Sequence, residues 1–142
     1  MRIVHVGASG EIGKAVSAEL GRRHDVIAVN LVRLGLPFLR GEGSFTLTSG
    51  PTNDDPISLG TSSAMVNGAL EGFVRSAAIE LREDRRINLV SPTMLEESSP
   101  LYGPYFRGSK AVATNDVVLG YIKSVEGRQT GCVYRIGWSR DH

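Results

Sequence analysis

Apolar residues gather in five short runs that predict β-strands. These runs are rich in valine, isoleucine and other apolar side chains, and glycine, proline or polar residues bound them, as is typical of strands. The predicted strands are residues 2–7, 25–30, 44–50, 86–92 and 131–137. Most read as buried strands, whereas residues 44–50 alternate between apolar and polar positions.

Other segments repeat their apolar positions at steps of three and four, which predicts helices. Predicted helices cover residues 11–20, 63–82 and 115–124, the last with Thr114 as its cap, and residues 31–40 resemble the second half of an amphipathic helix. The strongest stripe consists of Val66, Leu70, Phe73, Val74, Ala77 and Leu81. Residues 51–60 and 93–113 have the composition of loops.

A glycine-rich turn joins the first predicted strand to the first helix. Strand, turn, helix and strand follow one another within about thirty residues, which predicts a right-handed parallel βαβ unit. Glycines at such a turn let backbone N–H groups approach a pyrophosphate, and the helix N-terminus favours its negative charge. The alternative is that the glycines serve only a tight turn. A mononucleotide P-loop is disfavoured because no Gly-Lys-Ser/Thr follows.

The same segment therefore supplies the candidate cofactor residues. In the turn and the start of the helix they are Gly7, Ser9, Gly10, Glu11, Ile12 and Gly13. Asn30 ends the second predicted strand, where an acidic residue would bind the adenosine ribose of NAD. Because an amide neither attracts nor repels a 2′-phosphate strongly, the choice between NAD and NADP stays open.

Composition narrows the function classes. The 142 residues suit a single domain, and a net charge of +1 gives no electrostatic support for binding nucleic acid or an anionic membrane. The single Cys132 excludes an internal disulfide and a multi-cysteine metal site, and we expect no metal. The first residues show no signal-peptide pattern, so we expect a cytoplasmic protein.

Four blocks of sequence, in order, resemble the short-chain dehydrogenase/reductase family. They are VGASGEIG at residues 6–13, GSFTLTSG at 43–50, the long block MVNGALEGFVRSAAIELREDRRINLVSPT at 65–93, and TGCVYRIG at 130–137. The resemblance implies an α/β, three-layer, doubly wound Rossmann-like fold over residues 1–142. It also implies a nicotinamide cofactor and the ancestry of an oxidoreductase acting on a small carbonyl or alcohol.

The catalytic pair of that family is missing. Its members use a Tyr with a Lys four residues later, and none of the four tyrosines here has that Lys. The matching positions hold Ser63 and Asn67, and a hydroxyl beside a neutral amide is a poor proton donor near neutrality. The family's catalytic serine matches Ser49, with Gly50 an equally good match. A non-catalytic dinucleotide-binding or redox-sensing protein is therefore the alternative function.

The central strand–helix units of the family are also missing between Asn30 and Leu31. Two explanations stay open at this point. Either the chain carries an internal deletion, or a segment has been omitted between these two residues.

Two further resemblances concern binding. Residues 91–93, Ser-Pro-Thr, resemble the family's Pro-Gly segment, whose following backbone contacts the nicotinamide carboxamide. Pro92, Thr93 and Leu95 are therefore candidates for the cofactor, and a plain strand-to-loop turn is the alternative. Gly68 and Gly72 lie four apart on the long predicted helix, which packs against a partner subunit in the family. A homodimer or homotetramer is expected, and close packing of the helix on its own sheet is the alternative.

Overall fold

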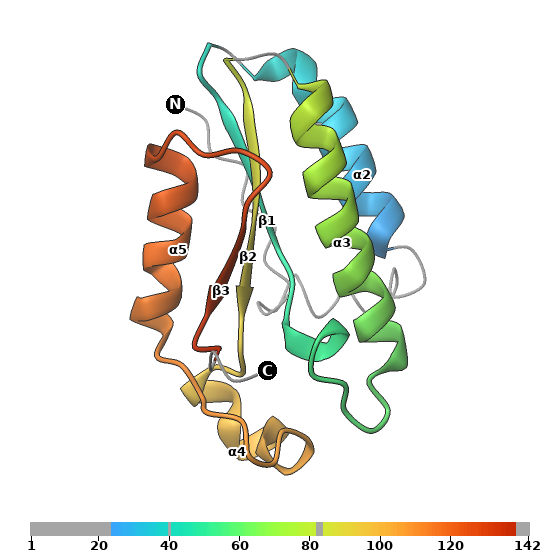
Figure 1. Cartoon of the computed structure of the whole chain (residues 1–142), viewed down its shortest axis with the longest axis vertical. Helices are drawn as coiled ribbons and strands as arrows, with labels where there is room; N and C mark the ends of the chain where they lie inside the picture. The colour runs from blue at the N-terminus through green and yellow to red at the C-terminus, as the bar shows by residue number, and fades with distance from the viewer. Residues whose placement is uncertain (1–23, 40, 82–83, 139–142) are drawn as a thin grey trace.

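The computed structural model describes residues 24–39, 41–81 and 84–138, and these form three layers. A parallel sheet stands between two helices on one face and one helix on the other (Figure 1). This is the α/β, Rossmann-like arrangement that the sequence predicts.

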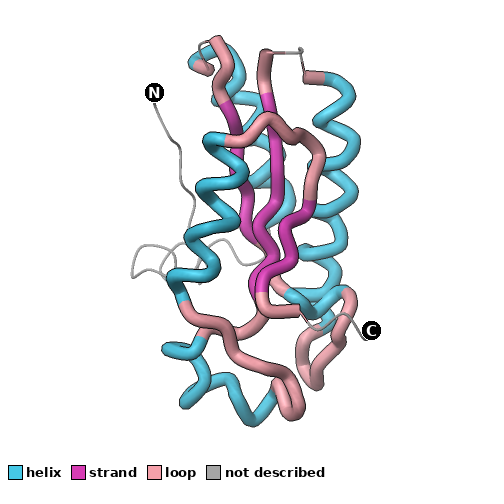
Figure 2. The backbone as a smooth tube through the Cα atoms, turned by 60° about the vertical axis from the view of Figure 1, so that its left-hand side comes forward, coloured by secondary structure: helices cyan, strands magenta, loops and turns pink. Residues whose placement is uncertain are grey.

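The described sheet has three strands in the order β1–β2–β3. They are β1 (Ser44–Thr48), β2 (Arg86–Pro92) and β3 (Val133–Ile136), and both neighbouring pairs are parallel. Figure 2 shows the three strands side by side with the helices around them. Since parallel neighbours need crossovers, helices connect the strands and cover both faces.

The helices follow the periodicity of the sequence. The longer ones are α2 (His24–Gly35), α3 (Thr61–Glu80) and α5 (Thr114–Glu126). Short helical turns fill the connections: η1 (Leu36–Phe38), η2 (Pro51–Asn53), η3 (Glu96–Ser98), α4 (Ser99–Tyr102) and η4 (Gly103–Tyr105). None of the helices in the described part of the chain combines the length and hydrophobicity that a membrane crossing requires.

The core lies on both faces of the sheet because side chains of a strand alternate between faces. On the face of α2 and α3 the buried residues are Val32, Phe45, Leu47, Leu70, Val74, Ile87 and Leu89. On the face of α5 they are Val90, Val112, Val117 and Tyr134. The predicted stripe of the long helix packs on the first of these clusters, which confirms its core-facing role.

One predicted strand is wrong. Residues 25–30 belong to the helix α2 and not to a strand. Ala28, Val32 and Leu36, at steps of four, pack on the core, and this helical period extends beyond the short apolar run that suggested a strand. Asn30 is therefore exposed on a helix instead of ending a strand, and α2 passes through the Asn30–Leu31 junction without a break.

The cap of α5 also differs from the prediction. Ala113 is the N-cap and Thr114 is the first helical residue. The Thr114 hydroxyl donates to Glu97 Oε1 at 2.7 Å, so it ties the preceding loop to the helix instead of capping it. The other predicted strands and helices from residue 44 onward are confirmed within a few residues at their ends. The predicted strand 2–7 and helix 11–20 lie outside the described residues.

Candidate functional site

The candidate site lies where β1 ends, at the carboxyl edge of the parallel sheet. In open α/β sheets this edge is where ligands bind. Ser49 and Gly50 follow β1 directly, η2 comes next, and the N-terminal half of α3 returns beside it (Figure 1). The Ser49 N–H donates to the Val90 carbonyl, which fixes the end of β1 against β2.

A chain of hydrogen bonds joins Ser63 and Asn67, the two residues that the sequence analysis matches to the family's Tyr and Lys. Asn67 Nδ2 donates to Thr52 Oγ1 at 2.8 Å, and the Thr52 hydroxyl donates to Ser63 Oγ at 2.9 Å. Asn67 and Thr52 are both buried, whereas Ser63 is exposed. The direction of the chain leaves the Ser63 hydroxyl proton at its exposed end, with no acceptor in the described part of the protein.

The structure thus brings Ser63 and Asn67 together through a residue that the sequence reasoning missed. Thr52 lies in a segment of turn composition, and nothing in the sequence pattern distinguishes it. Gly50 is also beside this chain, because a Cβ at that position would be 3.5 Å from Asn67 Nδ2. Ser63, Thr52 and Asn67 form one polar cluster with Gly50 beside it, and none of their side chains is ionisable near neutral pH.

Ser49 is not part of this hydrogen-bonded cluster. Its Oγ is buried and has no hydrogen-bond partner in the described part of the chain. A buried hydroxyl without a partner is costly and calls for an explanation. Its position at the carboxyl end of β1 makes Ser49 Oγ a candidate contact for a ligand there.

An ion-pair network lies one helical turn from Asn67. Glu71, only 5% exposed, accepts from Arg135 Nη2 at 2.9 and 3.0 Å and from Arg75 Nη2 at 2.9 Å. Asn53, in η2, donates to Glu71 Oε1 at 3.1 Å. Arg135 also pairs with Asp54 Oδ2 at 2.8 Å, and this bond is the main reason that the pKa of Arg135 is raised. The network holds η2, and with it Thr52, against α3 and β3.

The candidate nicotinamide segment comprises Pro92, Thr93 and Leu95, and the hydrogen-bond donors of Thr93 are already engaged within the protein. Pro92 ends β2, and the Thr93 N–H donates to the Ile136 carbonyl at 3.0 Å. The Thr93 hydroxyl donates to the Lys110 carbonyl, so neither donor of Thr93 is free for a ligand. Leu95 forms an isolated parallel bridge with Val112 and packs on the α5 side of the core.

The described ionisable groups with altered pKa values do not supply a proton donor near neutrality. Burial is the main cause that raises the pKa of Tyr134, which moves it away from neutral pH. The hydrogen bond from Thr114 lowers the pKa of Glu97, which favours its charged form. Neither residue belongs to the polar cluster of Ser63 and Asn67.

The remaining predicted site residues are placed as follows. Gly7, Ser9, Gly10, Glu11, Ile12 and Gly13 lie outside the described residues. Within the described ranges, no group of three or more His, Cys, Asp or Glu side chains is arranged to hold a metal ion.

Comparisons with solved structures identify proteins of the same fold. The protein lin1944 from Listeria innocua is 32% identical, with a TM-score of 0.75, and the match covers 91% of this chain and 96% of that one. A small-chain dehydrogenase in complex with NADPH is 25% identical, with a TM-score of 0.66 and coverage of 76% of this chain and 55% of its own.

A further small-chain dehydrogenase is 27% identical, with a TM-score of 0.62, and the match covers 76% of this chain and 50% of that one. The chain thus spans about half the length of these two dehydrogenases and nearly all of the solved lin1944 chain. No protein-family model and no curated protein matches the sequence.

Proposed function

This chain belongs to the short-chain dehydrogenase/reductase family, and on that premise we propose that residues 1–142 form one NAD(P)-binding domain of an oxidoreductase. The substrate we propose is a small carbonyl or alcohol compound. The glycine turn Gly7–Gly13 carries the proposal, together with a relative that was solved with NADPH. When bound, the nicotinamide would supply or accept the hydride.

The described residues fit a cofactor at the carboxyl edge of the sheet in one respect. Ser49 offers a buried hydroxyl at the end of β1 with no hydrogen-bond partner among the described residues. Pro92 and Leu95 flank the same edge, but the bonds of Thr93 prevent it from donating to a carboxamide without rearrangement. In this proposal the turn Gly7–Gly13 holds the pyrophosphate, and Ser49 orients the group nearest to β1.

Asn30 no longer has the position that suggested a ribose contact. It is exposed on α2, so we assign no ribose contact to it. The choice between NAD and NADP is therefore made by residues other than Asn30.

The chain's own contribution to the reaction is a hydrogen bond to the substrate oxygen. Asn67 and Thr52 orient Ser63 so that its hydroxyl proton points out of the cluster. A hydroxyl of high pKa polarises a carbonyl oxygen but does not release its proton near neutrality. The proton that completes a reduction would therefore come from water that reaches the exposed Ser63.

A second function is favoured by the same cluster. With Ser63 and Asn67 in place of the Tyr and Lys, the chain retains the glycine turn but not the acid–base pair. A non-catalytic dinucleotide-binding or redox-sensing protein, acting through a partner, needs only the glycine-rich sequence that binds the cofactor.

Titration with NADH and NADPH, followed by fluorescence, separates these functions when it is combined with a turnover assay. A panel of aldehydes and ketones is offered with each cofactor that binds. Binding with turnover supports the oxidoreductase, and binding without turnover supports the second function. Absence of binding for both cofactors would overturn both.

Replacement of Gly10 by leucine tests the pyrophosphate site directly. We expect Gly10→Leu to abolish cofactor binding, because a bulky side chain blocks the close approach of the pyrophosphate to the backbone. The fluorescence titration measures this, with thermal unfolding as the control for folding. An unchanged dissociation constant would show that the glycine turn does not hold the phosphates.

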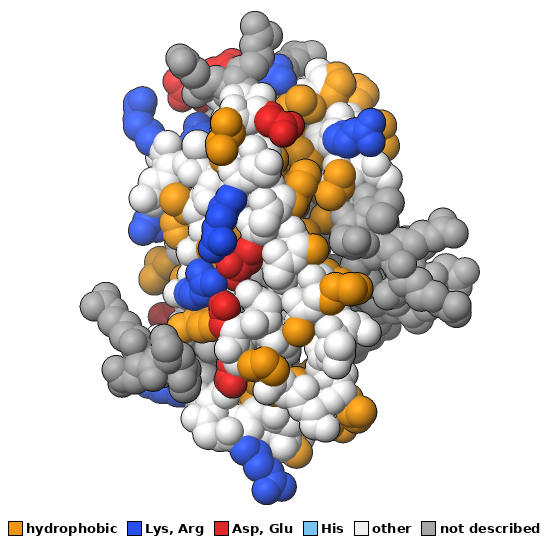
Figure 3. Space-filling model, turned by 45° about the vertical axis from the view of Figure 1, so that its right-hand side comes forward, with side chains coloured by type: hydrophobic (Ala, Val, Ile, Leu, Met, Phe, Trp, Pro, Cys, Tyr) orange, Lys and Arg blue, Asp and Glu red, His pale blue; other side chains and the backbone are white. Residues whose placement is uncertain are grey.

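We also propose that the protein assembles through the outer face of α3. Gly68 and Gly72 are exposed, and a Cβ at Gly72 would meet no described atom within 4 Å. Packing on the protein's own sheet therefore does not account for Gly72. Met65 is exposed on the same helix, and Figure 3 shows hydrophobic side chains on this side of the molecule. Small residues beside an exposed apolar side chain suit close contact with a second copy.

A leucine at Gly72 is expected to disrupt that assembly. Gly72→Leu places a large side chain where two helices would approach, while the helix itself gains up to about 1 kcal/mol of intrinsic stability. Light scattering after size-exclusion chromatography measures the mass. The matched control is Glu126→Leu on α5, which adds the same side chain elsewhere. A dimeric or tetrameric Gly72→Leu variant would contradict this interface, as would a monomeric unmodified protein.

A further inference from the structure

A cavity of about 420 Å³ lies at the amino ends of the strands, at the opposite end of the sheet from the candidate site. Its walls come from the residues before β1, the C-terminal end of α3, the start of β2 and the segment between α5 and β3. The lining residues are Glu42, Ala78, Ile79, Leu81, Asp84, Arg85, Arg86, Arg128 and Thr130. Its size falls within the usual range for small-molecule sites, roughly 300–1,000 Å³.

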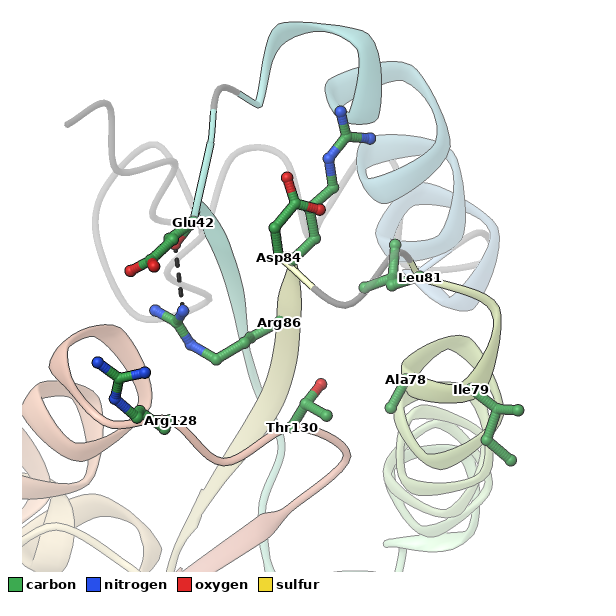
Figure 4. Close-up of a pocket in the computed structure, with 9 residues that line it drawn as sticks. Glu42, Ala78, Ile79, Leu81, Asp84, Arg86, Arg128 and Thr130 are labelled. Carbon is green, nitrogen blue, oxygen red and sulfur yellow. Dashed lines mark hydrogen bonds between the residues drawn. The ribbon is translucent and has the colours of Figure 1, made fainter.

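The cavity has a basic side and an apolar side. Arg86 and Arg128 lie on one side, and Ala78, Ile79 and Leu81 lie opposite, on and just after α3 (Figure 4). Ile79 is 86% exposed, so its side chain is available to a ligand. The two sides together suit a molecule that is itself both charged and apolar.

The arginines of this cavity carry charge that no described carboxylate neutralises. Every ion pair in the described part of the chain involves Arg75 or Arg135, which lie elsewhere. Arg86 donates only to backbone carbonyls, those of Glu42 at 3.2 Å and Val125 at 3.0 Å. It thereby fastens the last turn of α5, where a positive charge is favourable, and has a positioning role.

Among the described residues, the side chains of Arg85 and Arg128 form no hydrogen bond or ion pair. Arg85 Nε is buried without a hydrogen-bond partner, as is Arg86 Nε, and a buried donor of this kind is costly unless an acceptor reaches it. Glu42 and Asp84 also line the cavity, but both are exposed and neither forms an ion pair with an arginine of the described residues. With three guanidinium groups and two carboxylates, the lining carries a net positive charge.

We propose that this cavity binds a small amphipathic anion, a carboxylate or phosphate that carries an apolar group. The anionic head pairs with Arg128, which lies on the basic side of the cavity beside Arg86, because guanidinium groups match the geometry of carboxylate and phosphate oxygens. The apolar group lies against Ala78, Ile79 and Leu81. Ligands of open parallel sheets bind at the carboxyl ends of the strands. A ligand at the amino ends therefore occupies a second site, and its binding does not depend on the proposed cofactor.

Isothermal titration of the full chain with four probes tests the charge and the apolar group separately. Octanoate and octyl phosphate carry both features and distinguish the two possible heads, whereas inorganic phosphate lacks the apolar group and octanol lacks the charge. We expect the two amphipathic anions to bind at least about tenfold more tightly than the other two. Equal affinity for phosphate and octyl phosphate would overturn the role of the apolar wall, and failure of both amphipathic anions to bind would overturn the site.

Variants then locate the binding. Arg128→Gln is expected to weaken the binding of octanoate or octyl phosphate by about tenfold, since one charge-assisted pair is lost. Ile79→Ser tests the apolar wall in the same way, and Arg107→Gln, an exposed arginine at the other end of the molecule, is the matched control. Thermal unfolding verifies that each variant folds. If Arg128→Gln and Arg107→Gln bind alike, the anion does not occupy this cavity.

Discussion

Replacing Glu71 by alanine is expected to lower the free energy of unfolding by about 3 kcal/mol. The carboxylate is buried and accepts hydrogen bonds from Arg135, Arg75 and Asn53. Its removal leaves Arg135, whose side chain is only 33% exposed, with Asp54 as its remaining acidic partner. Breaking one member of a buried ion pair costs more than deleting both, because the remaining charge stays desolvated.

The loss should also reach the candidate site. Asn53 and Thr52 are neighbours in η2, so releasing Asn53 from Glu71 loosens the segment that carries Thr52. Urea unfolding measures the stability, and Glu80→Ala, an exposed acidic residue on the same helix, is the control with an expected change below about 0.5 kcal/mol. If the two variants unfold alike, the network contributes nothing to the fold.

Truncating Leu89 to alanine is expected to destabilise the protein by about 3 kcal/mol, within a range of roughly 2–5 kcal/mol. Leu89 is fully buried in the middle of β2, between strands on both sides, and packs in the cluster beneath α2 and α3. Its neighbours belong to regular elements and cannot collapse freely into the space, so a cavity adds to the lost transfer energy.

The control makes the same chemical change on the surface. Leu34 is 72% exposed on α2, and Leu34→Ala should change the unfolding free energy by less than about 0.5 kcal/mol. The urea midpoints of the two variants are compared with that of the unmodified chain. A Leu89→Ala variant as stable as Leu34→Ala would contradict the placement of β2 at the centre of the described sheet.

The spacing of the apolar residues, and the polar and turn-forming residues that bound each run, predicted much of the fold. The stripe from Val66 to Leu81 repeats over several turns, so its period is unambiguous, and α3 follows it closely. The run 86–92 begins at the charged Arg86 and ends at Pro92, and the strand β2 has the same limits. The strand prediction for residues 25–30 is wrong because four apolar residues in a run of six are too few to separate a strand from one face of a helix.

The candidate site was predicted less completely. Alignment of the long helix placed Ser63 and Asn67 at the family's Tyr and Lys positions, and the two are connected in space. Thr52 and Arg135 were missed because their roles depend on partners distant in the chain. Arg135 and Glu71, for example, are 64 residues apart.

The sequence by itself determined the class of fold and the order of its elements from residue 44 onward, and it predicts that the family's Tyr–Lys pair is absent. These depend on local periodicity and residue identity, which are present in the unfolded chain. Only the tertiary structure decided which polar groups meet. It gave Asn67 and Ser63 a common partner in Thr52, left Ser49 Oγ without one among the described residues, and gathered three arginines around a cavity. Hydrogen bonds and ion pairs act over a few ångströms, so they are settled only when packing brings distant segments together.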